Sequence, residues 1–199
     1  MNRRQFFDRH ARHWDEERPK EMAPRLERVL EEANLRAGQR VLDVGTGTGV
    51  LIPRIVPRIG DTGAVVALDI SAEMLAVARD KGVPANVTFL EGDMQDAPAL
   101  ADESFDRVIC NAAFPHFPDR RAALAEMIRV LRPGGHLIIS HPIGREAVNA
   151  LHCDQGGVVA EDRVPVAAEM QALLERAGLT EVRVIDEPEF YLAAGRKPG

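Results

Sequence analysis

From residue 40 onward the chain alternates between short, largely apolar segments and longer segments with helical spacing. The apolar segments lie at 40–44, 64–69, 87–90, 105–110 and 136–141. Helices are predicted after them at 50–59, 72–81, 120–131 and 165–177. Strands that are apolar on both faces and alternate with helices are typical of a parallel sheet that is covered on both sides.

Two further strands are predicted close to the C-terminus, at 181–185 and 189–194. Only three residues separate them, so they must pair as an antiparallel hairpin, because a parallel crossover needs a much longer connection. The sequence therefore predicts an α/β fold: a doubly wound, mostly parallel seven-stranded sheet with an antiparallel C-terminal hairpin and helices on both faces. We expect this domain to span residues 38–199.

Residues 1–37 differ in composition from the rest of the chain, because they are rich in charged residues and poor in strand-forming ones. Aromatic and aliphatic residues recur there at helical spacing, and prolines interrupt the segment near Pro19 and Pro24. We predict two amphipathic helices, the second ending at Gly38, which form an N-terminal helical lid or appendage rather than a second domain.

Two other segments are irregular. Pro57 lies inside the helix predicted at 50–59 and is expected to end or kink that helix early. Residues 142–164 show no clear pattern and are longer than an ordinary connection. Loops of that length are usually functional or mobile.

Composition excludes several classes of protein. Lys plus Arg number 25 and Asp plus Glu number 31, so the net charge is −6, which is not the basic footprint of a dedicated nucleic-acid binder. The two cysteines are too few for a disulfide framework. The apolar runs fall well short of the roughly 20 residues that span a bilayer, and the first residues do not form a secretory signal. We expect a cytoplasmic protein, monomeric or homodimeric, without a nucleic-acid partner.

The segment 43–49 reads Asp-Val-Gly-Thr-Gly-Thr-Gly and joins the first strand to its helix. In doubly wound sheets, ligands bind outside the carboxyl ends of the strands, where this turn lies. Glycine lets the backbone approach a ligand closely and adopt positive φ. Dinucleotide sites use a similar turn, so the ligand has to be inferred from further detail.

Two details separate the possible ligands. The dinucleotide pattern G-x-G-x-x-G is not met, because Gly49 comes one residue early and Val50 stands in its place. Asp43 precedes the first glycine by two residues, where a carboxylate would repel a pyrophosphate and attract a cation. S-adenosylmethionine carries a sulfonium and an ammonium group and no phosphate, so the acidic turn favours it.

Two more acids follow the next two strands. Asp69 lies 24 residues past Gly45, close to the spacing at which an acid accepts hydrogen bonds from ribose hydroxyls, and Ile70 would then lie beside the adenine. Asp93 can accept a hydrogen bond from the adenine amino group while Met94 packs on the ring. Either acid could instead only cap the turn or helix that follows it.

With these residues the chain resembles the class I, Rossmann-like S-adenosylmethionine-dependent methyltransferases. The match rests on segments 41–49, 68–71, 91–94, 105–111 and 130–135, in the order and spacing of that family. Residues 7–15 are similar to the F-D-x-x-A-x-x-Y-D segment of UbiE/MenG-like and related small-molecule methyltransferases, with Trp14 in the aromatic place. At 139–141 the chain has Ile-Ser-His where quinone methyltransferases have Glu-Phe-Ser, which weighs against a quinone acceptor.

The resemblance implies a cofactor-binding set. By that resemblance Asp43, Gly45 and Gly47 would hold the methionine moiety, and Asn111 would face it next to the methyl group. The complete set is Asp43, Gly45, Thr46, Gly47, Gly49, Asp69, Ile70, Asp93, Met94 and Asn111.

The candidate catalytic residues are histidines. His116 follows the fourth strand, where substrate meets cofactor in this fold, and His141 ends the fifth strand. Either could remove a proton from a methyl acceptor, because imidazole titrates near neutral pH. A metal site also stays open, since His141, His152, Cys153 and Asp162 together could form a His/Cys/carboxylate site, although their spacing matches no familiar zinc motif.

The expected function is transfer of the methyl group of S-adenosylmethionine to a small-molecule acceptor by in-line displacement. The sulfonium leaving group is already activated, so the protein has mainly to align the reactants and exclude water. The N-terminal helices and residues 142–164 are expected to close over the methyl group. The alternatives are a non-catalytic sensor or partner subunit that binds S-adenosylmethionine or a nucleoside, and an NAD(P)-dependent oxidoreductase, which Asp43 disfavours.

Overall fold

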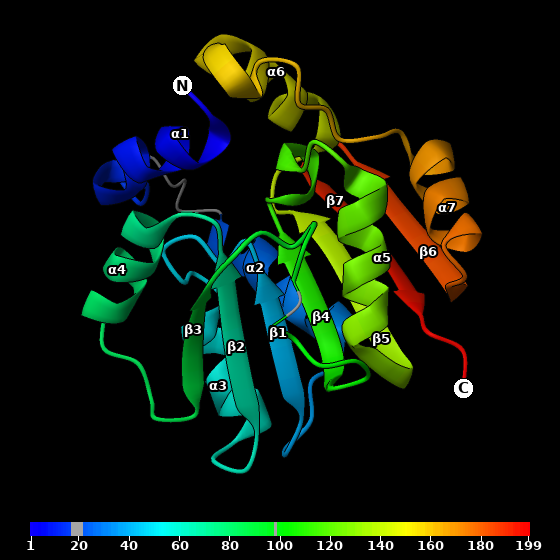
Figure 1. Ribbon diagram of the computed structural model, residues 1–199. Coiled ribbons are helices and arrows are strands. Elements are labelled where there is room, and N and C mark those ends of the chain that lie inside the picture. Colours follow the sequence, from blue (N-terminus) through cyan, green and yellow to red (C-terminus); the bar gives the residue numbers. More distant parts are fainter. Residues whose placement is uncertain (17–21, 98) are drawn as a thin grey trace.

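Seven strands join in one sheet in the order β3-β2-β1-β4-β5-β7-β6 (Figure 1). The structure is a computed structural model that describes residues 1–16, 22–97 and 99–199. The strands are β1 (Arg40–Val44), β2 (Ala64–Asp69), β3 (Val87–Glu91), β4 (Phe105–Asn111), β5 (Leu131–His141), β6 (Thr180–Glu187) and β7 (Phe190–Arg196). The α-helices are α1 (Arg3–His10), α2 (Met22–Ala33), α3 (Ile52–Ile59), α4 (Ala72–Asp80), α5 (Arg120–Val130), α6 (Arg145–Gln155) and α7 (Ala167–Arg176). Short 3₁₀ helices are η1 (Ala11–His13), η2 (Phe114–His116) and η3 (Gly157–Val159).

The pairing confirms the predicted sheet. Strands β1 to β5 pair in parallel, and β7 runs antiparallel to both β5 and β6. Within the sheet, the chain passes from β1 outward to β2 and β3, and then returns to β4 on the other side of β1. This reversal places a topological switch point at the carboxyl ends of β1 and β4, which is where such sheets bind ligands.

Both faces of the sheet are apolar and covered. Along β1, Val41 and Leu42 point to opposite faces and are both fully buried. Val41 belongs to the cluster that includes residues of α2 and α3, which lie behind the sheet in Figure 1. Leu42 belongs to the cluster that includes residues of α5 and α7. A continuous apolar strand is therefore what a sheet with helices on both faces requires.

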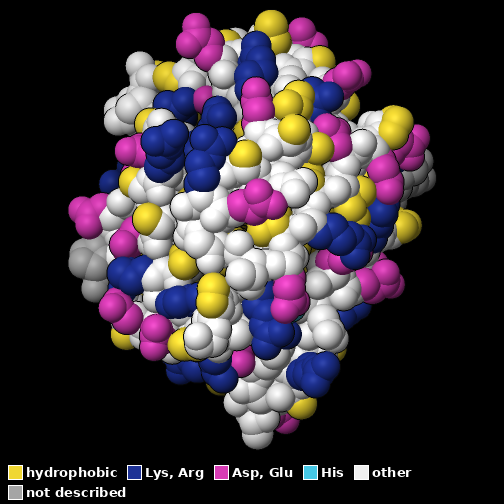
Figure 2. Space-filling model, turned by 90° about the vertical axis from the view of Figure 1, so that its right-hand side faces the viewer, with side chains coloured by type: hydrophobic (Ala, Val, Ile, Leu, Met, Phe, Trp, Pro, Cys, Tyr) yellow, Lys and Arg dark blue, Asp and Glu magenta, His cyan; other side chains and the backbone are white. Residues whose placement is uncertain are grey.

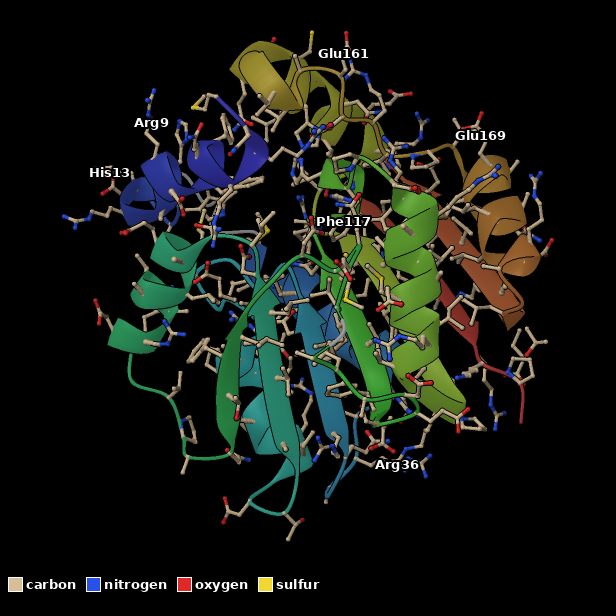
Figure 3. All side chains as sticks on the ribbon, in the orientation of Figure 1. Arg9, His13, Arg36, Phe117, Glu161 and Glu169 are labelled. Atoms are coloured by element: carbon tan, nitrogen blue, oxygen red, sulfur yellow. The ribbon has the colours of Figure 1, made fainter. Side chains whose placement is uncertain are left out.

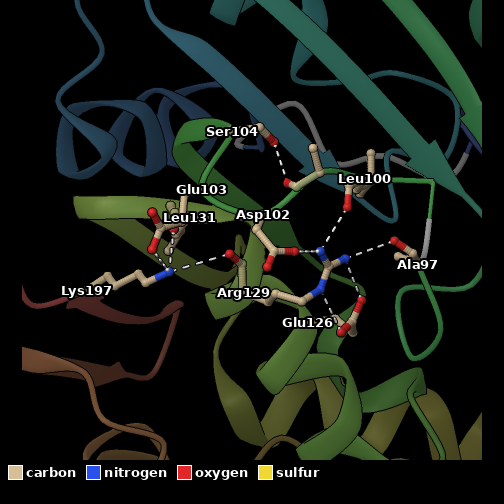
Figure 4. A network of polar contacts seen from close by, with 10 residues as sticks. Ala97, Leu100, Asp102, Glu103, Ser104, Glu126, Arg129, Leu131 and Lys197 are labelled. Carbon is tan, nitrogen blue, oxygen red and sulfur yellow. Dashed lines mark hydrogen bonds and ion pairs between the residues drawn. The ribbon is translucent and has the colours of Figure 1, made fainter.

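The connection from β3 to β4 is fixed by one arginine. Arg129 of α5 donates to the carbonyl oxygens of Ala97 and Leu100 over 3.0 and 2.9 Å, and it pairs with the carboxylates of Glu126 and Asp102 (Figure 4). The carbonyl oxygen of Ala97 also accepts from the N–H of Leu100 over 3.1 Å, so Arg129 adds a second bond there and gives the carbonyl oxygen of Leu100 a partner. On the face seen in Figure 2, acidic and basic side chains are interspersed.

One expectation about prolines was wrong, because α3 does not end at Pro57. Helix α3 continues through Pro57 to Ile59, because Ile55 and Ile59 are both fully buried and hold the last turn against the sheet. The helix ends where the N–H of Gly60 donates to the carbonyl oxygen of Val56. Pro24 lies within the first turn of α2, where a proline needs no backbone partner, so it does not interrupt the helix. Pro19 lies outside the described residues.

The segment 142–164 is not a plain loop. It forms α6, which follows Gly144 and ends at Gly156, and then η3. Within α6 only Val148 and His152 are buried, so the helix leaves almost no apolar periodicity in the sequence. This explains why the pattern of residues did not predict it.

The N-terminal helices occupy two different places. Helix α2 buries Leu26, Val29 and Leu30 in the core, whereas α1 lies above the carboxyl ends of the strands, in contact with α4 and η3 (Figure 1). That α1 acts as a lid, and that residues 1–37 form a unit apart from 38–199, stay predictions. Among the described residues, no helix is long and apolar enough to cross a membrane.

Candidate functional site

A cavity of about 800 Å³ opens at the carboxyl ends of β1, β2, β4 and β5. Residues of α1 and α6 line its outer side, so these two helices roof the switch point of the sheet (Figure 3). The predicted site residues that line it are Gly45, Thr46, Gly47, Asp69, Ile70, Asp93, Met94, Asn111, His116, His141 and His152. Asp43 and Gly49 do not line the cavity and stand behind its wall.

The glycine turn needs glycine for two reasons. Gly45, Gly47 and Gly49 have φ of +65°, +55° and +77°, a region that L-residues rarely enter. A Cβ added to Gly45 would also lie 2.3 Å from Cβ of Ala113, at the end of β4. The first glycine therefore lets two neighbouring strand ends approach each other at the floor of the cavity.

Asp43 lies at the end of β1 and is almost fully buried. Burial raises the pKa of its carboxyl to about 7, while a hydrogen bond from Thr46 Oγ1, 2.6 Å from Oδ2, acts in the opposite direction. A carboxyl in this condition ionises readily when a cation comes near, which suits a positively charged ligand above the glycine turn.

Asp69 ties the glycine turn to the end of β2. Its Oδ2 accepts a hydrogen bond from the N–H of Gly47 over 2.8 Å, and its Oδ1 accepts one from the N–H of Ser71 over 2.9 Å. Burial nevertheless raises the pKa of this carboxyl, with the hydrogen bonds from Ser71 and Gly47 opposing it. The carboxylate thus organises the turn while it still lines the cavity.

The adenine end of the predicted site has a polar and an apolar element. Asp93 accepts hydrogen bonds from the backbone and side chain of Gln95 over 2.9 and 3.0 Å. Met94 is almost fully buried and lines the cavity, together with Ile70. This arrangement can hold the edge of a planar ring at the acid and its face at the methionine.

Asn111 is fixed at the end of β4. The hydroxyl of Ser140 donates to its Oδ1 over 3.0 Å, and Ala112, the next residue, has φ of +55°. The chain is held in this strained turn because the N–H of Ala112 donates to the carbonyl oxygen of Ser140 over 2.7 Å. The amide of Asn111 is therefore held in place at the cavity wall.

Three histidines gather at the other end of the cavity. Nδ1 of His116 lies 2.7 Å from Oδ2 of Asp162, and the rings of His116 and His152 are 4.7 Å apart. Nε2 of His141 is buried without a hydrogen-bond partner among the described residues. Burial, and then the nearby His116 and His152, lower the pKa of His141 to about 3. Burial likewise lowers the pKa of His152.

The structure does not bring His141, His152, Cys153 and Asp162 together as a metal site. Among the described residues, no group of three or more His, Cys, Asp or Glu side chains could hold a metal ion. Cys153 is exposed, whereas its neighbour His152 is buried and lines the cavity. The two residues therefore point to different sides of α6.

Several lining residues were not predicted. Arg3 and Phe117 carried no distinguishing pattern in the sequence. Val148, Leu151, His152 and Gln155 of α6 also line the cavity at helical spacing, but two of the four are polar, so no apolar periodicity marks this face in the sequence. For Asp162 the sequence suggests only a role as metal ligand.

Comparison with known proteins identifies the family. The model of the methyltransferase domain family matches residues 42–139. An S-adenosylmethionine-dependent methyltransferase of known structure from Aquifex aeolicus is 30% identical, and the alignment covers 86% of this chain and 88% of that one with a TM-score of 0.70. The chain belongs to the class I S-adenosylmethionine-dependent methyltransferases. The expected family, enzyme class and co-substrate are thereby confirmed.

Other relatives of this methyltransferase are more distant or only partly matched. UbiE of Coxiella burnetii, a ubiquinone/menaquinone biosynthesis C-methyltransferase, is 40% identical over 115 residues, which is 56% of this chain and 46% of that protein. The match thus spans less than half the length of these curated relatives. The YcgJ protein of Bacillus subtilis is 23% identical over 89% of this chain and 99% of its own, with a TM-score of 0.73, and shares the fold.

Proposed function

We propose that this methyltransferase transfers the methyl group of S-adenosylmethionine to a neutral, largely apolar small molecule that binds beneath α1 and α6. One observation carries the proposal: a single cavity runs from Asp69 and the glycine turn to a chamber lined by histidines and apolar side chains. Donor and acceptor can therefore meet within one continuous cavity, as in-line displacement requires.

The donor end is proposed to use the predicted set. The glycine turn would hold the methionine moiety, with the carboxyl of Asp43 behind it. Asp69 and Ile70 would hold the ribose and adenine, and Asp93 and Met94 the adenine edge and face. The sulfonium supplies an activated methyl group, so the chain needs no acid to assist the leaving group. Its own contribution is alignment, with Asn111 beside the methyl position.

The acceptor end favours a molecule without net charge. Arg3 and Asp162 pair with each other over 2.5 Å, and His141 is held neutral by burial. Phe7, Phe117 and several aliphatic side chains supply most of the remaining wall. An aromatic hydroxyl compound suits these surroundings, and the name of the UbiE relatives makes a reduced quinone one member of that class to test.

His116 is the better of the two candidate bases. It lines the cavity, and Asp162 holds its ring through Nδ1. The low pKa of His141, about 3, makes that imidazole a poor acceptor of a proton, and we propose that it only hydrogen-bonds the acceptor.

The test has a binding step and a transfer step. Isothermal titration with S-adenosylmethionine and S-adenosylhomocysteine should show binding of both. Transfer of labelled methyl to a panel of phenols, hydroquinones and naphthols should follow, with simple amines as the charged comparison. Binding without transfer to any acceptor would favour the non-catalytic sensor, and absence of binding by folded protein would contradict both functions.

A further inference from the structure

Asp162 joins three separate segments around the acceptor end of the cavity. Its side chain is buried and does not itself line the cavity. Oδ1 accepts from Arg3 of α1 over 2.5 Å, and Oδ2 lies 2.7 Å from Nδ1 of His116 in η2. Its backbone carbonyl oxygen lies 3.0 Å from Nδ1 of His152 in α6. One residue thus contacts two imidazole rings and helix α1.

These contacts determine which ring nitrogens carry protons. Burial acts to raise the pKa of Asp162, but hydrogen bonds from His116 and Arg3 prevail and hold that pKa below its ordinary value. The carboxyl is therefore ionised at neutral pH and can only accept hydrogen bonds. Nδ1 of His116 must then be the protonated nitrogen, and the same reasoning applies to His152, because a carbonyl oxygen also only accepts.

Helix α1 also covers the ring that Asp162 holds. The rings of Phe7 and His116 meet edge to face with their centres 5.2 Å apart, on the same helix that supplies Arg3. Four charged or titratable side chains surround His116: Arg3 from α1, His141 from β5, His152 from α6 and Asp162 after η3. The position of α1 and the orientation of the imidazole therefore depend on the same carboxylate.

We propose that Asp162 is a positioning residue that holds His116 in the Nδ1–H tautomer, so that Nε2 accepts the proton of the methyl acceptor, with Arg3 orienting Asp162 when α1 is closed. This inference rests on the proposed function. In the step, the acceptor's O–H bond breaks and its proton passes to Nε2 of His116. The acceptor forms a bond to the methyl carbon, and the C–S bond breaks with its electron pair remaining on sulfur, which gives S-adenosylhomocysteine.

The geometry makes an unusual prediction about substitutions at position 162. In Asp162→Asn, Arg3 can only donate, so it retains the amide oxygen and turns the amide NH₂ toward Nδ1 of His116. That NH₂ requires an unprotonated Nδ1 and so forces the Nε2–H tautomer, which cannot act as a base. In Asp162→Ala the ring loses its support but keeps a free choice of tautomer. The isosteric asparagine is therefore expected to be the more damaging change.

The experiment measures tautomer, binding and turnover in the full chain. Nitrogen-15 NMR of the histidine rings, in the presence of S-adenosylmethionine, should show the Nδ1–H form of His116 in the natural protein and the Nε2–H form in Asp162→Asn, with assignment by His116→Gln. With an active acceptor, kcat should fall about 100-fold or more in Asp162→Asn and about 10-fold in Asp162→Ala. Affinity for S-adenosylmethionine should stay within about twofold.

Two further variants complete the design. Glu161→Gln removes the adjacent, exposed acid, which points outward in Figure 3, and should leave tautomer and kcat unchanged. Arg3→Ala combined with Asp162→Asn frees the amide to rotate, so its oxygen can accept from Nδ1 of His116. This double variant should regain the Nδ1–H tautomer, a result that mere loosening of α1 would not produce.

The outcomes separate this inference from the proposed function. Suppose that the natural protein transfers methyl groups. The positioning role is then overturned, and the transferase left intact, if Asp162→Asn is at least as active as Asp162→Ala. The same holds if Asp162→Asn leaves the tautomer of His116 unchanged. An Nε2–H tautomer in the double variant would overturn the part assigned to Arg3. Failure of the natural protein to bind S-adenosylmethionine would instead overturn the proposed function and this inference with it.

Discussion

The hydroxyl of Thr46 donates a hydrogen bond to Oδ2 of Asp43 over 2.6 Å, at the buried end of β1. The bond favours the ionised carboxyl, but burial is the larger effect and raises the pKa of Asp43 to about 7. Near neutral pH the acid is therefore only partly ionised before a ligand arrives. A cation above the glycine turn would complete its ionisation.

Binding of S-adenosylmethionine should consequently release a proton. Affinity should rise as the pH rises from about 5.5 to 6.5, because this window lies below the pKa of about 7 for Asp43 and more than one unit below the ordinary pKa of an α-amino group, about 7.7–8.0. Titration calorimetry in two buffers of different ionisation enthalpy measures the released fraction. Asp43→Asn should abolish the release and weaken binding about tenfold, whereas Thr46→Val should move its midpoint to higher pH. Equal heats in both buffers would contradict the role given to Asp43.

The contact between Gly45 and Ala113 predicts an order of stability among glycine variants. Gly47→Ala introduces only the strain of positive φ, because no atom lies within 4 Å of the added Cβ, and should cost about 1–2 kcal/mol. Gly45→Ala adds a clash with Ala113 to similar strain and should cost about 1–3 kcal/mol more. Ala113→Gly should recover that second part in the double variant. Urea unfolding measures all four proteins, and equal losses for the two single alanine variants would show that the strand ends can separate.

Asp69→Ala should weaken binding of S-adenosylmethionine by about 1–3 kcal/mol if the carboxylate holds the ribose. The variant also loses the bonds to the N–H groups of Gly47 and Ser71, so its unfolding free energy has to be measured beside its affinity. Asp61→Ala removes an exposed acid at the opposite end of β2 and serves as the control. Unchanged affinity in a destabilised Asp69→Ala protein would assign Asp69 to the turn alone.

The features that could be predicted from the sequence are those that local sequence pattern and sheet topology determine. The strands followed from unbroken apolar runs such as Val41 and Leu42, which pack on opposite faces of the sheet. The acids and glycines at 43–49 and Asp69 followed from strand ends that meet at one edge of a parallel sheet. Short-range pattern and topology were sufficient for these residues.

The remaining features depend on partners far apart in the chain. Asp162 bonds Arg3 and His116, which are 159 and 46 residues away, and no spacing rule connects such residues. Helix α6 was missed because burial of Val148 and His152 alone leaves a faint pattern. The path through Pro57 is decided by packing of Ile55 and Ile59, which overrides the local preference of proline.

Asp43 and His141 should give the stability of the ligand-free protein two opposing dependences on pH. The pKa of Asp43 is raised from 3.8 to about 7 in the folded state, so its contribution is fully present below pH 3.8 and is lost as the pH rises toward 7. The pKa of His141 is lowered from 6.5 to about 3, so its contribution is fully present above pH 6.5 and is lost as the pH falls toward 3. Between about pH 4.5 and 6.5 the two slopes oppose each other.

Each single variant should therefore remove one of these two opposing slopes. Relative to the natural protein, in which other shifted groups such as Asp69 and His152 are also present, the unfolding free energy of Asp43→Asn should rise from pH 4.5 to 6.5. That of His141→Gln should fall over the same interval, by up to about 2–3 kcal/mol in each case. Urea unfolding at four pH values in this window measures both slopes, with His13→Gln as the control because His13 is exposed on η1. Parallel curves for Asp43→Asn and His141→Gln would mean that at least one of these groups is not held uncharged in the folded protein.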